Sequence, residues 1–484
     1  MRSLLRYDRR YSRAPTATAG AFLLVLLVGM CAALVLGGCA EGPWGDEPVS
    51  GVGDSSADGA PEAEAARAES LRASLSVDSE YTMGPVKGAP LLRVGLARAV
   101  SEVSVGCDGA YSVTLFGEKV HEWPSESGGE WRFEATHKGV SGEGPSGSFP
   151  PAGGTVRMAP DEGAATLEFE GTRYRGEIEI FSAAPGSLSV ANVVDLESYL
   201  RGVVPREIGP RPESEIEAVK AQAVAARTYA VASSGKRAGG SFDVWTTVAD
   251  QVYGGVDAET PVSDRAVMET AGVIAVYVGE PINAYFHANC GGRTEARHEV
   301  WELPGLPYLE SIWDTPGGST RLGSAYCFEG TGFAWEEEWS ASEIERVVRD
   351  NLPGTASTPA PGGVTSVRNL RVSATTPSGR VRWLEVETNL GKHRVFGDRV
   401  RWLLRRPDSG RILRSAWFEL DVTTSGGRVT RVVARGRGYG HGVGMCQHGA
   451  LEMAREGYGY EDILRHYYAG IEIAEDYGRR PGRR

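Results

Sequence analysis

An alanine-rich segment is the feature of this sequence that most constrains the fold. Residues 212–234 read PESEIEAVKAQAVAARTYAVASS, and Ser214 stands where it can cap the N-terminus of a helix. Apolar residues recur at helical spacing at Ile216, Val219, Ala223, Ala226 and Ala230. A helix so rich in alanine lets another backbone approach closely, so we expect it to be buried.

Short β-type runs surround this helix. From Leu91 to Phe181 they alternate with turn clusters, including a loop at 141–154, and further strands follow a turn-rich stretch at 351–363. Two short helices are expected near the C-terminus, around LEMAREG and YEDILRHYY. With 64 Gly and 26 Pro in 484 residues, the chain is typical of a loop-rich globular protein. We therefore predict an α+β fold with a β-rich body, a buried alanine-rich helix and C-terminal helices.

The N-terminus has the order of an export signal. Five arginines precede an apolar run at 19–38, which ends at Cys39. The last four residues, LGGC, resemble the lipobox of bacterial lipoproteins, in which the cysteine becomes lipidated. An uncleaved anchor or plain secretion is the alternative, because about 20 apolar residues can also span a bilayer. Each alternative predicts a protein outside the cytoplasm, and the lipobox predicts one anchored to the membrane.

The sequence divides into five regions. We predict a signal peptide with lipobox at 1–39, a disordered acidic linker at 40–90 and a β-rich module at 91–185. The region that carries the candidate motifs follows at 186–473, with its core motifs at 190–300 and a Gly-His motif at 436–473, and then a basic tail at 474–484. The linker carries ten acidic and three basic residues and few large apolar ones. The chain's net charge of -12 argues against a nucleic-acid partner, which requires a basic surface.

Glu207 is the first candidate for chemistry. It lies in VVPREIGP, between a strand-like apolar run and the alanine-rich helix. Proline and isoleucine neighbours favour partial desolvation, which raises the pKa of a carboxyl and keeps its proton available near neutral pH. The alternative is an ordinary surface glutamate in a connecting segment.

A glycine-rich loop and the cysteines form the other candidates. The loop GRGYGHGVGMCQHG (436–449) contains His441 and many glycines. Glycine lets a ligand or another chain approach the backbone closely, but a tight turn before a helix would explain these glycines equally well. Cys446, with His441 or His448 as base, is a candidate thiol nucleophile. His287, Cys290, Cys327 and Cys446 form a candidate zinc set. Disulfides among these cysteines and Cys107 are an alternative in an exported protein, and free buried thiols are another.

Several ordered motifs resemble the stage II sporulation protein D family, also called the LytB amidase-enhancer family. They are VDLESYLRGVVPREIGP, EAVKAQAVAARTYA, QVYGG, YFHANCGGRTE with VWELPGLPYLESI, and GRGYGHGVGMCQHGALEMAREGYGYEDILRHYYAGIEI. They extend from about residue 194 to 473, and several motifs in order are far more specific than any one of them.

The resemblance implies a peptidoglycan lytic transglycosylase that acts on glycan strands stripped of stem peptides. Glu207 would be its catalytic acid, and one carboxyl suffices if the MurNAc C6 hydroxyl replaces water and a 1,6-anhydro sugar forms. The residues expected to bind the substrate are Arg227, Tyr229, Gln251, Tyr253, His441 and Gln447. For each of them the alternative is that it is a polar residue of the core, hydrogen-bonded within the protein. The other implied function is that of a non-catalytic activator of an amidase, which binds peptidoglycan.

No cofactor is required for this chemistry, and a structural zinc is the one addition that the sequence suggests. Zinc-bearing members of the family carry a His-Cys pair just before the Gln-Val-Tyr motif, where this chain has Thr247-Val248-Ala249-Asp250. Any metal ligands must therefore come from the His287, Cys290, Cys327 and Cys446 set.

Overall fold

The structure is a computed structural model that describes residues 88–118, 120–161, 165–234, 241–246, 250–358, 362–475 and 477. The predicted signal peptide with Cys39, nearly all of the linker and most of the basic tail lie outside these residues. No helix among the described residues is long and apolar enough to cross a membrane.

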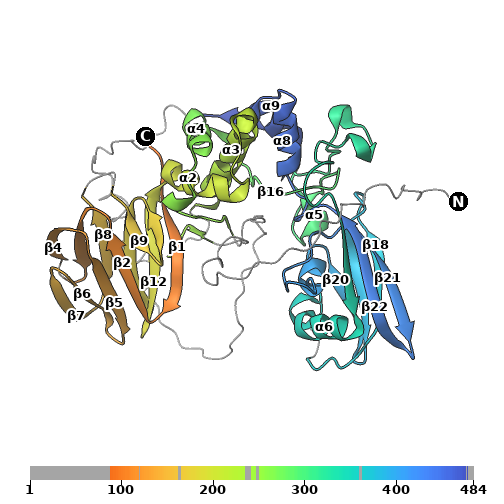
Figure 1. The fold of residues 1–484 in the computed structure, drawn as a ribbon, viewed down its shortest axis with the longest axis horizontal. Helices are drawn as coiled ribbons and strands as arrows, with labels where there is room; N and C mark the ends of the chain where they lie inside the picture. Colours follow the sequence, from red (N-terminus) through yellow and green to blue (C-terminus); the bar gives the residue numbers. More distant parts are fainter. Residues whose placement is uncertain are drawn as a thin grey trace, which may run out of the picture. The chain divides into compact units, whose positions relative to one another are not determined.

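The first part of the described chain is a β-rich module, drawn in orange to yellow in Figure 1. Its strands are β1 (Leu91–Val100), β2 (Glu102–Cys107), β3 (Ala110–Phe116), β4 (Val120–Ser127), β5 (Glu130–Thr136), β6 (Gly139–Gly144), β7 (Gly147–Ala152), β8 (Thr155–Pro160), β9 (Leu167–Phe169), β10 (Thr172–Tyr174), β11 (Glu177–Ala184), β12 (Ser187–Asp195) and β13 (Val244–Trp245). One sheet has the order β13-β1-β12-β11-β8-β3-β4 and the other β10-β9-β2-β5-β6-β7.

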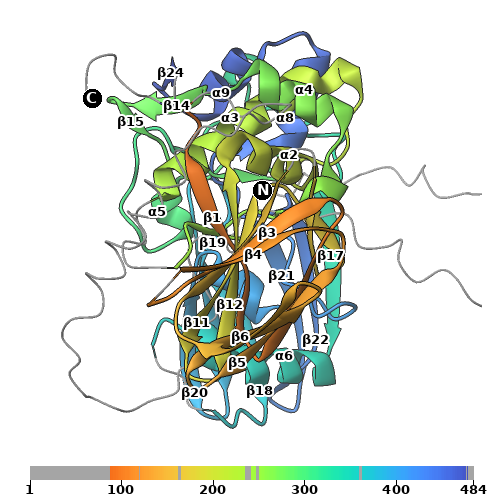
Figure 2. The same ribbon diagram turned by 90° about the vertical axis from the view of Figure 1, so that its left-hand side faces the viewer.

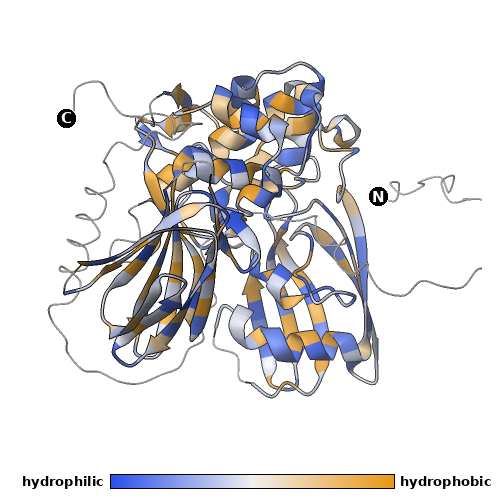
Figure 3. Cartoon of the chain, turned by 60° about the vertical axis from the view of Figure 1, so that its left-hand side comes forward, coloured by the Kyte–Doolittle hydropathy of each residue, from blue (hydrophilic) through white to orange (hydrophobic). Residues whose placement is uncertain are grey.

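Alternation along these strands builds the core between the two sheets. In β5, Trp131 and Phe133 are buried while Arg132 and Glu134 are exposed, as expected for a strand with one wet face. Figure 3 shows this alternation as orange and blue bands along the strands.

The helices are α2 (Leu196–Glu207), α3 (Ile216–Ser233), α4 (Pro261–Glu269), α5 (Arg297–Val300), α6 (Ala341–Thr355), α7 (Arg399–Leu403), α8 (Gln447–Arg455) and α9 (Tyr460–Tyr467). Helix α3 is the predicted alanine-rich helix, and it is buried among α2, α4, α8 and α9 (Figures 1 and 2). The prediction that Ser214 caps this helix is wrong. A 3-10 turn, η1 (Glu213–Glu215), precedes α3, and the N-cap residue is Glu215, whose side chain makes no capping hydrogen bond.

A second hydrophobic core lies within the region expected at 186–473. It is built from β17 (Ala334–Ser340), β18 (Val367–Thr375), β19 (Val381–Thr388), β20 (Gly391–Phe396), β21 (Phe418–Ser425) and β22 (Arg428–Arg437), with α6 and α7. Two sheets, β17-β22-β21 and β18-β19-β20, contribute to it. Residues 351–355, which we expected in a turn, form the end of α6, whose N-terminus is fixed by a capping box between Ser340 and Glu343.

Short elements complete the fold. They are β14 (Ile274–Tyr277), β15 (Glu280–Pro281), β16 (Phe286–His287), β23 (Met445–Cys446), β24 (Glu472–Ala474), and the 3-10 turns η2 (Val256–Ala258), η3 (Pro316–Gly318) and η4 (Leu322–Ser324). Strand β16 pairs in parallel with β23, which places His287 opposite Cys446. The α+β class predicted from the sequence is confirmed, and distant segments meet around α3.

Candidate active site around Glu207

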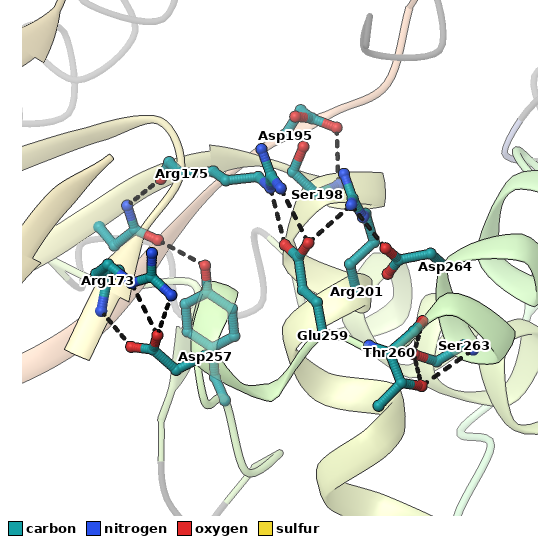
Figure 4. Close-up of polar contacts among 12 residues, drawn as sticks. Arg173, Arg175, Asp195, Ser198, Arg201, Asp257, Glu259, Thr260, Ser263 and Asp264 are labelled. Atoms are coloured by element: carbon teal, nitrogen blue, oxygen red, sulfur yellow. Dashed lines mark hydrogen bonds and ion pairs between the residues drawn. The ribbon is translucent and has the colours of Figure 1, made fainter. Parts of the chain in front are cut away.

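A helix cap and a set of ion pairs fix the positions of α2 and of residues 257–264, as Figure 4 shows. Asp195 caps α2 by accepting from the backbone N–H groups of Glu197 and Ser198 at 3.1 and 3.0 Å. Arg201, on the same helix, reaches Glu259 and Asp264, each at 2.7 Å. Helix α2 is therefore tied to residues 259–264, directly after the Gln-Val-Tyr motif.

The same segment is tied to the β-rich module. Arg175 donates two hydrogen bonds to Glu259 at 2.8 and 2.9 Å, and Arg173 pairs with Asp257 at 2.6 Å. Residues 257–264, which follow the loop that carries Gln251, Val252 and Tyr253, are thus held between α2 and the strands (Figure 4).

Glu207 lies in the last turn of α2, and only 6% of its surface is exposed. Its Oε1 atom accepts a hydrogen bond from the Val252 backbone N–H at 2.9 Å, while its buried Oε2 atom has no partner among the described residues. Burial raises the pKa of this carboxyl to about 8, although the Val252 N–H acts in the opposite direction. Helix C-termini also disfavour negative charge, so the position suits a protonated acid.

Gln447 is the predicted binding residue that lies directly against Glu207. Its Nε2 atom donates to the Glu207 carbonyl at 3.1 Å and to Gln222 Oε1 at 3.2 Å. One of the carbonyls that a helix leaves unpaired at its C-terminus is thereby bonded. The beginning of α8 and the middle of α3 together hold the end of α2 in place.

Gln251 and Tyr253 lie on either side of Val252, and both are buried. Gln251 accepts from the Tyr199 hydroxyl at 3.3 Å and donates to the Ala226 carbonyl at 3.3 Å. The Tyr253 hydroxyl donates to Asn192 at 3.0 Å. These bonds fix the backbone that presents the Val252 N–H to Glu207.

Arg227 and Tyr229 have different surroundings although they are neighbours on α3. Arg227 has no exposed surface, and its guanidinium makes two bonds to Glu197, at 2.8 and 2.7 Å. Tyr229 is partly exposed and donates to Asp250 at 3.2 Å. Arg227 therefore belongs to a core ion pair, while Tyr229 reaches the surface.

His441 is buried in the glycine-rich loop. Its Nδ1 atom accepts from the Val443 N–H at 3.0 Å, and its ring lies near those of Trp301 and His287, at 5.1 and 5.4 Å between centroids. The glycines around it serve packing: a Cβ on Gly442, whose φ is +84°, would lie 2.5 Å from the Arg380 guanidinium.

The predicted cysteines meet in the core, but with a different fourth residue. Ligand atoms of Cys290, Asp314, Cys327 and Cys446 all lie within 4.8 Å of one another. His287 lies outside this group; its Nδ1 atom is 3.2 Å from the Val443 carbonyl, and its ring interacts with the Cys446 thiol. The cluster can hold a metal ion, and Asp314 stands where the sequence suggested His287.

The other interpretations of the cysteines have less support in the structure. All four cysteines in the described part of the chain are buried free thiols, and Cys107 is separate from the other three, at the end of β2. Cys446 has no exposed surface, which does not suit a nucleophile that must reach a peptide. Burial raises the pKa values of the Cys290 and Cys327 thiols.

Three contributions to the site were not predicted. The Val252 N–H is a backbone group, which no side-chain motif reveals, although its place inside Gln-Val-Tyr is the available signal. Gln222 is the one amide side chain within the alanine-rich helix, a polar residue on a buried surface. Asp314 lies in SIWDTPGG, where no neighbouring residue suggests a metal site.

Comparisons with known proteins agree with this arrangement. The model described as stage II sporulation protein matches residues 184–277, which contain α2, α3 and the Gln-Val-Tyr segment. A model described as a domain of unknown function matches residues 324–444, which contain the second core. The first match defines a class of protein built around α2 and α3.

Named relatives extend the match. The chain is 31% identical to the stage II sporulation protein D of Bacillus amyloliquefaciens over 305 residues, which are 59% of this chain and 76% of that protein. It is 33% identical to an uncharacterized protein of Brachyspira hyodysenteriae over 310 residues, 64% of this chain and 74% of the relative. It is 30% identical to the amidase enhancer of Bacillus subtilis over 299 residues, 57% of this chain and 40% of that protein. The chain belongs to the stage II sporulation protein D family.

Proposed function

We propose that the protein is a lytic transglycosylase that cleaves the MurNAc-GlcNAc β-1,4 bond of peptidoglycan and leaves a 1,6-anhydro end. The observation that carries this proposal is the Glu207 carboxyl, which is buried, has a pKa raised to about 8 and has one oxygen without a partner among the described residues. Such a group holds a proton at neutral pH, and its Oε2 atom makes no bond to the described residues that would compete for that proton.

In the first step Glu207 gives its proton to the oxygen between MurNAc C1 and GlcNAc C4. The C1–O bond breaks, and GlcNAc leaves with a hydroxyl at C4. The remaining carboxylate is then a stronger base than an exposed glutamate, because burial disfavours its charge.

In the second step the MurNAc C6 hydroxyl closes onto C1, and its proton returns to Glu207. No water is consumed, and the carboxyl regains its starting state. One carboxyl thus serves as acid and base in turn, whereas most glycosidases need two.

The neighbouring residues act mainly by holding this carboxyl. Gln447 fixes the carbonyl end of α2, and Gln251 and Tyr253 fix the segment that donates to Oε1. Tyr229 is the candidate for sugar contact on α3 because it is partly exposed. Arg227 is left out of the proposed sugar site, since Glu197 engages its guanidinium.

Activation of an amidase is the second candidate function, and it rests on the 30% identity to the amidase enhancer of Bacillus subtilis. A binding protein of this kind would not require a proton donor. The unpartnered oxygen of Glu207 favours the enzyme, because an uncompensated buried carboxyl is an expensive feature for a surface that only binds.

We further propose that the protein works outside the cytoplasm, anchored through a lipid on Cys39. The support is the sequence of basic residues, apolar run and LGGC. Labelling with a radioactive fatty acid in vivo should mark the wild type and not Cys39→Ala. Equal labelling of both proteins would contradict the anchor.

Product analysis tests the enzymatic proposal. Purified protein is incubated with glycan strands stripped of stem peptides, and the products are examined by mass spectrometry. The wild type and a control with an exposed carboxyl removed, Glu461→Gln, should give 1,6-anhydro products, while Glu207→Gln should give none. Hydrolysed ends in place of anhydro ends would contradict the mechanism. No product without an added amidase, together with a faster amidase in its presence, would favour the second function.

A further inference from the structure

We propose that Cys290, Asp314, Cys327 and Cys446 bind one structural zinc ion. The four side chains come from four separate segments and have essentially no exposed surface. Thiolates and carboxylates are both zinc ligands, and four such groups converging in a buried core match the closed, four-coordinate arrangement of structural zinc sites. The proposal does not depend on the function proposed for Glu207.

The distances match a tetrahedral site. The Cys290 and Cys327 sulfurs are 3.4 Å apart, and the Cys290 sulfur lies 3.1 Å from Asp314 Oδ2. Bonds of about 2.3 Å to sulfur and 2.0–2.2 Å to oxygen put ligand atoms roughly 3.5–3.8 Å apart around zinc. These two distances are within a few tenths of an ångström of that spacing, and all four ligand atoms lie within 4.8 Å of one another, so small shifts of the side chains complete the coordination.

Backbone N–H groups already point at the sulfur of Cys446. Those of Cys290 and Gly449 lie 3.2 and 3.4 Å from it. Cys446 is also the N-cap of α8, where a helix favours negative charge. These contacts stabilise a thiolate, which is the form that binds a metal.

Asp314 is held by a partner of its own. The Tyr467 hydroxyl donates to Oδ1 at 2.6 Å, which leaves Oδ2 toward Cys290. Gly449 makes room for this pair, since a Cβ there would lie 2.1 Å from the Tyr467 hydroxyl and 2.6 Å from Asp314. Partners that orient a ligand in this way are a regular part of zinc sites.

A disulfide between Cys290 and Cys327 explains these observations less well. It would use two of the three thiols and give no role to Cys446, Asp314 or Tyr467. It would also leave a fully buried carboxylate whose one neighbouring cation among the described residues would be a protonated His466, with its Nε2 atom 3.7 Å from Asp314. Zinc engages all four side chains and supplies the positive charge.

Metal analysis of the full-length protein tests the site. The protein is purified without metal-affinity resin or chelator, and metals are measured by mass spectrometry. We expect close to one zinc per chain in the wild type and in Cys107→Ser, the matched control with a buried thiol outside the cluster. Cys290→Ser and Asp314→Ala should fall below about 0.2 zinc per chain. Tyr467→Phe should keep all four ligands but bind zinc about 10–100-fold more weakly.

The proposal is overturned by a wild type without zinc, by a wild type whose intact mass shows a disulfide, or by Cys290→Ser with as much zinc as Cys107→Ser. If the ligand variants do not fold, wild type grown in cobalt-supplemented medium provides the test. Thiolate-to-cobalt charge-transfer absorption supports the site, and its absence in a cobalt-loaded protein contradicts it. Iron in place of zinc would also contradict it.

Discussion

Helix α2 carries a glutamate in its first turn and another in its last turn, and these two equally buried side chains differ in their hydrogen-bond partners. Glu197 in the first turn and Glu207 in the last turn are each 6% exposed. Glu197 receives two bonds from Arg227, one from the Gly272 N–H and one from the Tyr477 hydroxyl. Glu207 receives one bond in all from the described residues, from Val252. Burial alone therefore does not mark a functional acid; burial without compensation does.

Removing the partner of Glu197 is the largest change that we predict for stability. Arg227→Met leaves a buried carboxylate without its cation, so the free energy of unfolding should fall by about 3–5 kcal/mol. Urea unfolding at pH 7 measures it. The double variant Glu197→Gln with Arg227→Met should recover part of the loss, and a loss below about 1 kcal/mol in Arg227→Met would contradict the pairing.

Glu207→Gln should raise the free energy of unfolding at high pH, whereas Arg227→Met lowers it. The carboxyl has a pKa of about 8 in the folded protein and an ordinary value near 4.5 when unfolded, so the folded state binds more protons between these values. The free energy of unfolding of the wild type therefore falls by on the order of a few kcal/mol as pH rises from 4.5 to 8. Glu207→Gln should not show the fall that is due to this carboxyl.

Comparing unfolding of the two proteins at pH 5 and pH 9 measures the Glu207 contribution. Glu177, whose pKa burial raises to about 7, titrates in the same range but is present in both proteins and cancels. Parallel pH dependence of the two proteins would refute the assignment of a raised pKa to Glu207.

Gln447→Leu tests whether the end of α2 needs its cap. Loss of the two amide bonds should lower kcat roughly 3- to 10-fold, the equivalent of about one net hydrogen bond, with KM unchanged. A raised KM with an unchanged kcat would show instead that Gln447 binds sugar. Steady-state kinetics on stripped glycan strands separates the two roles.

The exposed pair Arg173 and Asp257 should matter least. Half of the Arg173 side chain and about a third of that of Asp257 are in water, so Arg173→Ala should change the free energy of unfolding by less than about 1 kcal/mol. The same unfolding assay measures it at low and high salt. A loss as large as that of Arg227→Met would break the distinction between buried and exposed pairs.

The sequence predicted much of this fold because its main signals are local. Alanine spacing predicted α3, alternation predicted the strands of the first module, and the Pro and Ile neighbours of Glu207 predicted its burial. Helix α6 was not predicted because the proline and glycine near its end are typical of a turn. The capping box of Ser340 and Glu343 is the sequence signal that indicates this helix.

The site residues were harder to predict because their partners are distant in sequence. Arg227 looks like a ligand-binding arginine until Glu197, 30 residues away, occupies it. His287 is the fourth ligand that the sequence suggests, whereas the fold brings the carboxylate of Asp314 to the three thiols from a segment without a metal motif. Sequence spacing reveals which residue types are present, whereas partners across the fold decide which of them are free to act.

Direct titration of the Glu207 carboxyl tests the central claim. Infrared difference spectra between the wild type and Glu207→Gln isolate the band of one protonated carboxyl. We expect this band to be present at pH 7 and to disappear with a midpoint near pH 8. A difference spectrum without the band at pH 7, or a midpoint near the ordinary value of 4.5, would contradict it.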